Sequence, residues 1–225
     1  MEIDNTKIEW LGHSGFCISN SKYNKVFYID PYQLARTEPK ADVLLITHGH
    51  YDHCSITDMN KIVKDGTLIF CTADCQSAIT KLDKRVNMQT VEPGQELKLN
   101  DIKIAVVPAY NTKKIFHPRS ENLVGYVITF GNVTIYHAGD TDLIKEMEKL
   151  TGYGKEGQKF IVLLPVGGKF TMNAEEAAKA ASLIKPTLAV PIHWGGIIGS
   201  NEDANSFCNI CESFGIEAKI LEKVN

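Results

Sequence analysis

Short apolar runs rich in β-branched residues dominate the first half of the chain, and turn-forming residues bound them. Runs of this length and composition are typical of strands. We predict strands near residues 6–10, 15–19, 25–30, 43–46, 67–71, 102–107, 124–130 and 132–137. Gly131 and Asn132, between the last two runs, predict a hairpin turn because both residue types tolerate positive φ.

Five segments have apolar residues at helical spacing, and in the second half of the chain they alternate with strands. We predict helices near residues 56–64, 74–82, 142–149, 173–184 and 202–213. Asn173 and Glu176 have the spacing of a capping box at the start of the fourth helix, and Pro186 ends it. Further strands are expected at 160–165, 187–190 and 216–221, alternating with these helices. This order predicts an α/β fold of two packed sheets with helices outside.

Composition narrows the class of partner. The net charge is -3, and the two signs of charge are interspersed, so the chain lacks the basic surface typical of proteins that bind nucleic acid or anionic membranes. We therefore expect a small-molecule substrate and neither a nucleic-acid nor a membrane partner. No repeat or linker marks a boundary, which predicts a single domain over residues 1–225.

The expected location is the cytoplasm. The first residues lack the basic and apolar regions of a secretory signal, and no run approaches the length of a membrane span. In that compartment the six cysteines stay reduced. Cys208 and Cys211 form a CxxC without a second pair, so we assign them a buried or structural role.

The densest chemical signal is the segment Thr47-His48-Gly49-His50-Tyr51-Asp52-His53, which directly follows an apolar strand. Imidazole nitrogens and carboxylate oxygens are ligands that suit Zn²⁺ and neighbouring divalent ions. Residues two apart in an extended segment point the same way, so His48 and His50 can hold one ion. Asp52 and His53, on the following turn, can serve a second ion.

This segment resembles the HxHxDH signature of the metallo-β-lactamase superfamily, and further elements of that family follow in order. Asp30 matches the family's supporting aspartate, Asp140 the aspartate that bridges two metals, and His193 the late histidine after a C-terminal strand. The resemblance implies an αββα four-layer sandwich with two central mixed β-sheets. It also implies that Asp30 orients a ligand histidine.

One element departs from the family pattern. Most members place a histidine between HxHxDH and the bridging aspartate, at the end of a strand, and here that slot holds Asn111. We expect the following loop to deliver His117 instead, with Asn111 or solvent as the alternative. The resemblance thus implies a set of metal ligands: His48, His50, Asp52, His53, His117, Asp140 and His193.

The resemblance implies a binuclear metal-dependent hydrolase. Two divalent ions, zinc with manganese or iron as alternatives, lower the pKa of a shared water and so provide a hydroxide nucleophile. The cationic site should attract a small anionic ester, lactone, amide or phosphodiester. We expect catalytic roles for Asp52, Asp140 and His137, with simple packing as the alternative for His137. For His13 a role at the site and a structural role stay open.

Two other functions are weighed against hydrolysis. Flavodiiron-like redox relatives usually carry glutamate at the position of His50 and an added flavodoxin-like domain, which this chain lacks. A non-catalytic metal-binding or regulatory module is the second alternative. Structural zinc prefers closed, thiolate-rich sites, and the only cysteine near the histidine segment is Cys54. The sequence therefore favours the hydrolase.

Overall fold

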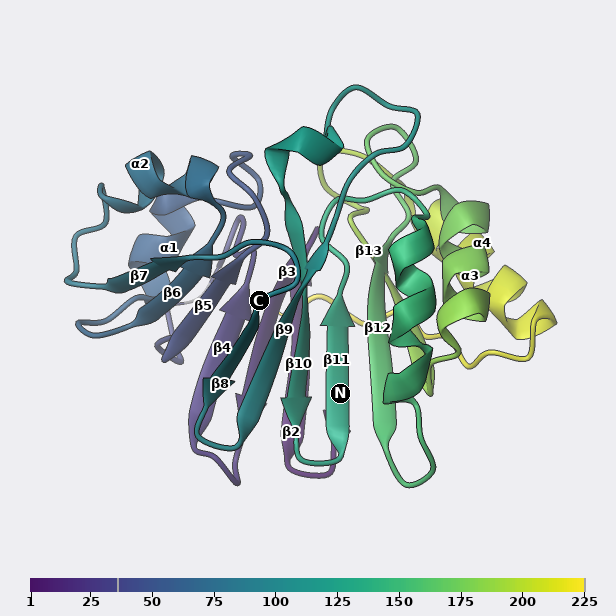
Figure 1. Cartoon of the computed structure of the whole chain (residues 1–225), viewed down its shortest axis with the longest axis horizontal. Coiled ribbons are helices and arrows are strands. Elements are labelled where there is room, and N and C mark those ends of the chain that lie inside the picture. Colours follow the sequence, from purple (N-terminus) through teal and green to yellow (C-terminus); the bar gives the residue numbers. More distant parts are fainter. Residues whose placement is uncertain (36, 225) are drawn as a thin grey trace. The chain divides into compact units, whose positions relative to one another are not determined.

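The computed structural model describes residues 1–35 and 37–224. The chain divides into two compact units, unit 1 with residues 1–91 and 221–225 and unit 2 with residues 92–220. Each unit contains one mixed β-sheet and helices of its own (Figure 1). This confirms the predicted α/β class with two mixed sheets, whereas the single domain over residues 1–225 stays a prediction.

Unit 1 is built on a seven-stranded sheet in the order β1-β2-β3-β4-β5-β6-β7. Neighbours pair antiparallel from β1 to β4 and parallel from β4 to β7. Its elements are β1 (Glu2–Ile3), β2 (Thr6–Gly12), β3 (Gly15–Asn20), β4 (Lys25–Ile29), β5 (Val43–Ile46), α1 (Ile56–Ile62), β6 (Leu68–Cys71), η1 (Ala73–Cys75), α2 (Gln76–Ile79) and β7 (Asn87–Thr90). Every residue of β5 is buried, as expected for a central parallel strand covered on both faces.

Unit 2 contains a six-stranded sheet in the order β13-β12-β11-β10-β9-β8. Its antiparallel part runs from β8 to β11, and β11, β12 and β13 pair in parallel. Its elements are β8 (Glu96–Leu99), β9 (Ile102–Pro108), η2 (Arg119–Glu121), β10 (Val124–Phe130), β11 (Val133–His137), η3 (Lys145–Tyr153), β12 (Lys159–Pro165), α3 (Ala174–Ile184), β13 (Leu188–Ile192) and α4 (Asn201–Ser213). Helices α3 and α4 lie beside β12 and β13 (Figure 1), and the capping box predicted at Asn173 and Glu176 is present.

The predicted strands of the first half are confirmed with small differences at their ends, but the two-residue β1 and the strands β7 and β8 were not predicted. β7 is mostly polar and largely exposed at the edge of its sheet, and β8 is a run of only four residues, two of them charged. Pairing of their backbones with β6 and β9 defines them, and apolar patterning does not reveal such pairing. The prediction of a strand at 216–221 is wrong, because only an isolated bridge between Ala189 and Ala218 forms there.

Two predicted helices are shorter or shifted. The segment predicted as a helix at 74–82 is a 3₁₀ turn followed by the short α2. The helix predicted at 142–149 begins only at Lys145 and has 3₁₀ geometry. The Asp142 side chain accepts hydrogen bonds from Asn111, Thr112 and Lys114, which hold the start of this segment in a loop.

The strand directions place the chemically interesting loops at common sheet edges. In unit 1, β2, β4 and β5 run the same way, and His13, Asp30 and Thr47 follow directly after their C-terminal ends. In unit 2, β9, β11, β12 and β13 share one direction, so the loops after them meet at one edge of that sheet. Asp140 and His193 lie in two of these loops.

Candidate metal centre

Asp30 holds the histidine segment of unit 1 through hydrogen bonds. Its side chain is fully buried, and Oδ1 accepts the backbone N–H of Thr47 at 2.8 Å. Oδ2 accepts the Thr47 hydroxyl at 2.6 Å and faces His53 Nδ1 at 2.7 Å. Because a carboxylate only accepts hydrogen bonds, His53 carries its proton on Nδ1, which leaves Nε2 as the metal-binding nitrogen. This contact identifies His53 as the histidine that Asp30 orients.

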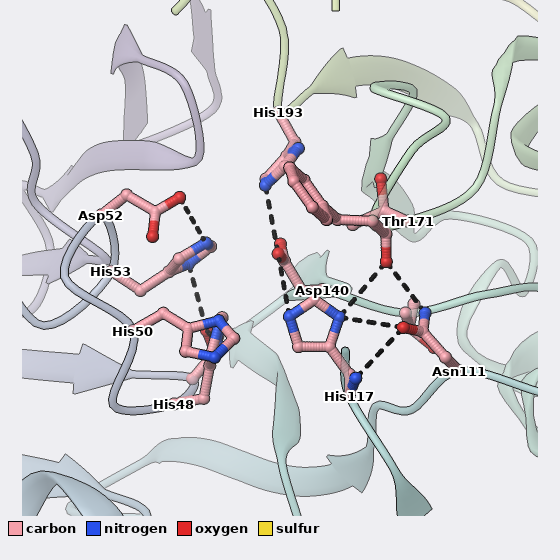
Figure 2. A network of polar contacts seen from close by, with 12 residues as sticks. His48, His50, Asp52, His53, Asn111, His117, Asp140, Thr171 and His193 are labelled. Atoms are coloured by element: carbon pink, nitrogen blue, oxygen red, sulfur yellow. Dashed lines mark hydrogen bonds and ion pairs between the residues drawn. The ribbon is translucent and has the colours of Figure 1, made fainter. Parts of the chain in front are cut away.

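His48 and His50 lie side by side in the same segment (Figure 2). His48 Nε2 is 3.0 Å from His50 Nδ1, so the two rings direct a nitrogen toward the same point, as their spacing predicts. Gly49 between them donates its backbone N–H to Asp74 Oδ2 at 2.7 Å. A Cβ atom at position 49 would lie 2.7 Å from the same oxygen, so a larger residue there would displace the Asp74 carboxylate.

Asp52 connects two further histidines. Its Oδ2 is 3.0 Å from His13 Nε2 and 3.6 Å from His53 Nε2. Each of these three residues offers a ligand atom, and those atoms all lie within 4.8 Å of one another. His13, whose role the sequence left open, therefore belongs to the cluster. The only sequence signal for it was its position directly after a strand.

Asp140 lies between two histidines in unit 2 (Figure 2). Its Oδ2 is 3.1 Å from His193 Nε2 and 3.5 Å from His117 Nε2. All three side chains are buried. Two imidazole nitrogens and a carboxylate, gathered in a buried position, form a donor set that fits Zn²⁺ and related divalent ions.

Asn111, the residue in the slot where the family usually has histidine, contacts His117 directly. Asn111 Oδ1 lies 3.1 Å from His117 Nδ1 and accepts the His117 backbone N–H at 3.2 Å. The carbonyl oxygen of Phe170 is 3.2 Å from the same ring nitrogen. A carbonyl can only accept, so Nδ1 carries the proton and Nε2 is left to face Asp140. The structure thus gives Asn111 the role of positioning the imidazole.

A partly buried ion pair anchors the loop that carries His117. Asp142 Oδ1 accepts from Lys114 Nζ at 2.5 Å and from Asn111 Nδ2 at 3.1 Å, and Lys114 also donates to the carbonyl of Thr171. Burial by itself would raise the pKa of the Asp142 carboxyl, but the hydrogen bonds from Lys114 and Thr112 hold that pKa below its ordinary value. Sequence patterns do not reveal this anchor, because Lys114 and Asp142 meet only in the folded chain.

Asn111→Leu tests the positioning role. The change keeps the size of the side chain but removes one of the two acceptors that face His117 Nδ1, leaving the carbonyl of Phe170, so we expect metal affinity to fall by about tenfold. Calorimetric titration of the metal-free variant with Zn²⁺ measures this. Asn209→Leu, at an exposed position of α4, is the matched control. Wild-type affinity in Asn111→Leu would rule the role out.

Gly167 packs closely against His193 in the unit 2 cluster. A Cβ atom on Gly167 would lie 2.9 Å from His193 Nδ1 and 2.7 Å from its carbonyl oxygen. We therefore expect Gly167→Ala to displace the His193 ring and to weaken metal binding, measured by competition with a chromogenic chelator. Gly152→Ala, where a Cβ meets nothing within 4 Å, should bind metal as the wild type does. Equal affinity of the two variants would contradict this prediction.

His137 and Trp194 have structural contacts of their own. His137 is fully buried at the end of β11, and its Nδ1 accepts the backbone N–H of Gly139 at 3.2 Å. This bond shapes the turn that leads to Asp140. The catalytic role expected for His137 therefore stays a prediction. Trp194, next to His193, is also buried and donates to the carbonyl of Pro191.

Comparisons with known proteins agree with this chemistry. A family model described as beta-lactamase superfamily domain matches residues 7–193. A UPF0173 metal-dependent hydrolase from Nanoarchaeum equitans is 33% identical over 223 residues, which is 96% of this chain and 97% of the relative. In the described part of the chain, no helix has the length and apolar character to cross a membrane.

Solved structures with the same fold include two proteins described as hydrolases. A putative metal-dependent hydrolase from Parabacteroides distasonis has a TM-score of 0.82 and 29% identity, covering 98% of this chain and 94% of the other. Igni18, a metallo hydrolase from Ignicoccus hospitalis, has a TM-score of 0.77 and 26% identity, covering 98% and 96%. The chain belongs to the metallo-β-lactamase superfamily, among its metal-dependent hydrolases.

Proposed function

We propose that the protein is a binuclear zinc hydrolase of a small, anionic ester, lactone, amide or phosphodiester. The observation that carries the proposal is the buried carboxylate of Asp140 flanked by the Nε2 atoms of His117 and His193. Asp140 also stands at the sequence position of the aspartate that bridges two metals in the superfamily. Manganese and iron accept the same donor set. Which metal is bound therefore depends on which metals are available as well as on the ligands.

The residues that would hold the two ions come from both sets described above. They are His48, His50, Asp52 and His53 of unit 1, and His117, Asp140 and His193 of unit 2. When bound, divalent ions bring the pKa of water toward neutrality and polarise a carbonyl or phosphoryl oxygen. Histidine binds a metal ion only through a neutral imidazole. Protonation of the histidines at acidic pH should therefore compete with metal binding.

The chain's own residues account for orientation and proton handling. Asp30 and Asn111 fix the rings of His53 and His117 through their Nδ1 atoms, so each ring needs no reorganisation to bind through Nε2. We propose that Asp52, whose carboxylate adjoins His13 Nε2, takes the proton that the attacking water loses and passes it toward that imidazole.

The test combines metal counting with a substrate panel. Metal-free protein would be reloaded with Zn²⁺, Mn²⁺ or Fe²⁺, its metal content measured by elemental analysis, and its rates measured on ester, lactone, β-lactam and phosphodiester substrates. We expect two ions per chain and hydrolysis that chelators abolish. Redox turnover by the iron form without hydrolysis would favour the flavodiiron-like alternative. Tightly held zinc without activity on any substrate would favour a regulatory module.

A further inference from the structure

Two large apolar side chains are exposed on the loop that delivers His117. Ile115 is 87% exposed and Phe116 is 40% exposed, whereas His117 next to them is buried. Solvent-exposed apolar residues next to a buried polar cluster are more informative than single ones elsewhere, because they mark surfaces that contact a ligand. Neither side chain contributes to the core of unit 2.

A second aromatic residue joins this pair from the loop after β12. The rings of Phe116 and Phe170 meet edge to face with their centroids 4.7 Å apart. Phe170 is also fixed to the candidate metal ligands, because its carbonyl oxygen accepts from Asn111 Nδ2 at 2.9 Å and lies 3.2 Å from His117 Nδ1. The same residue thus orients the imidazole with its backbone and packs its ring against that of Phe116.

The charged side chains that the two loop segments themselves contribute are lysines. Lys169 Nζ lies 5.1 Å from the centroid of the Phe170 ring, and Lys113 is exposed on the other loop. The two loop segments, residues 109–118 and 167–173, contain no aspartate or glutamate. An apolar surface edged by cations matches a ligand that has both an apolar group and a negative charge.

We propose that Ile115, Phe116 and Phe170 form a binding subsite for the apolar acyl or aryl group of the substrate, with Lys169 beside it for an anionic group. This inference rests on the proposed hydrolase function and narrows its substrate to amphipathic anions. Burial of alkyl or aromatic carbon against these side chains would supply affinity, and the position of His117 would place the reacting group near Asp140.

A protein partner fits this surface less well. Stable protein interfaces bury about 800 Å² on each partner, far more than three side chains provide. The loop is also held by the Lys114–Asp142 ion pair and by the bonds of Asn111, so its apolar residues are presented on a fixed backbone. A fixed surface of this small area matches one apolar group of a small molecule better than a protein partner.

The experiment compares carboxylates that resemble hydrolysis products. Zinc-loaded protein would be titrated calorimetrically with acetate, butyrate, hexanoate and benzoate. In the wild type we expect affinity to rise with chain length, by up to about fourfold for each methylene group that becomes buried. Phe116→Ala and Phe170→Ala should flatten this rise, losing about tenfold for hexanoate and much less for acetate. Phe170→Ala keeps the backbone carbonyl that contacts His117.

Phe214→Ala is the matched control, because Phe214 is 47% exposed directly after α4. It should bind all four carboxylates as the wild type does. Equal affinity for acetate and hexanoate in the wild type, or an unchanged chain-length dependence in both phenylalanine variants, would overturn the subsite and leave the hydrolase proposal intact. If the zinc-loaded wild type binds no carboxylate and hydrolyses no substrate of the panel, the hydrolase proposal fails and the subsite falls with it.

Discussion

Asp140→Ala should abolish hydrolysis and lower the number of bound metal ions. The carboxylate is buried between two imidazole nitrogens at 3.1 and 3.5 Å, so its removal takes away the anionic ligand of that cluster. Loss of several kcal/mol of transition-state stabilisation corresponds to a rate decrease of at least about 1000-fold. Steady-state kinetics and elemental analysis of the same preparation measure both effects.

The control for this prediction is Asp101→Ala, which removes an exposed aspartate from unit 2. It should retain wild-type rates and metal content. His50→Ala should behave like Asp140→Ala, because His50 is one of the paired imidazoles of unit 1. Full activity in Asp140→Ala or in His50→Ala would count decisively against the assigned ligands.

Asp30→Ala should cause the largest loss of stability among the substitutions considered. The change leaves the backbone N–H and the hydroxyl of Thr47 and the Nδ1–H of His53 without their carboxylate acceptor in a fully buried position. Breaking a buried hydrogen-bonded network of this kind costs about 3–5 kcal/mol of unfolding free energy. Denaturant unfolding of the metal-free protein isolates this effect from metal binding.

Thr47→Val is a milder change in the same network. It provides the test if Asp30→Ala does not fold. It removes only the hydroxyl, which contacts Asp30 and lies 3.0 Å from His48 Nδ1. We expect a smaller destabilisation, about 1–2 kcal/mol, together with weaker zinc binding. If both variants unfold and bind zinc as the wild type does, Asp30 does not organise the histidine segment.

The sequence was most informative where one short segment contains several ligands. His48, His50, Asp52 and His53 lie within six residues, so local geometry largely decides which side chains can share an ion. The strands that precede the site residues were also predictable, because their apolar residues are buried in the sheets.

Contacts between segments far apart in the chain could not be predicted from sequence patterns. His13 reaches Asp52 across 39 residues, and Asn111 contacts Phe170 across 59 residues, so no local pattern relates these pairs. The role of Asn111 follows from a single hydrogen bond to an imidazole nitrogen. Polar edge strands such as β7 escaped prediction for the same reason, since a partner strand defines them.

The most direct test of the central claim is anomalous diffraction at the zinc absorption edge from crystals of the zinc-loaded protein. The proposal predicts two zinc ions in each chain that both contact the carboxylate of Asp140. One ion should also be bound by His48 and His50, and His193 should be among the ligands of the other. A zinc-loaded crystal with no ion at Asp140, or with a single ion that contacts none of these histidines, would contradict the account.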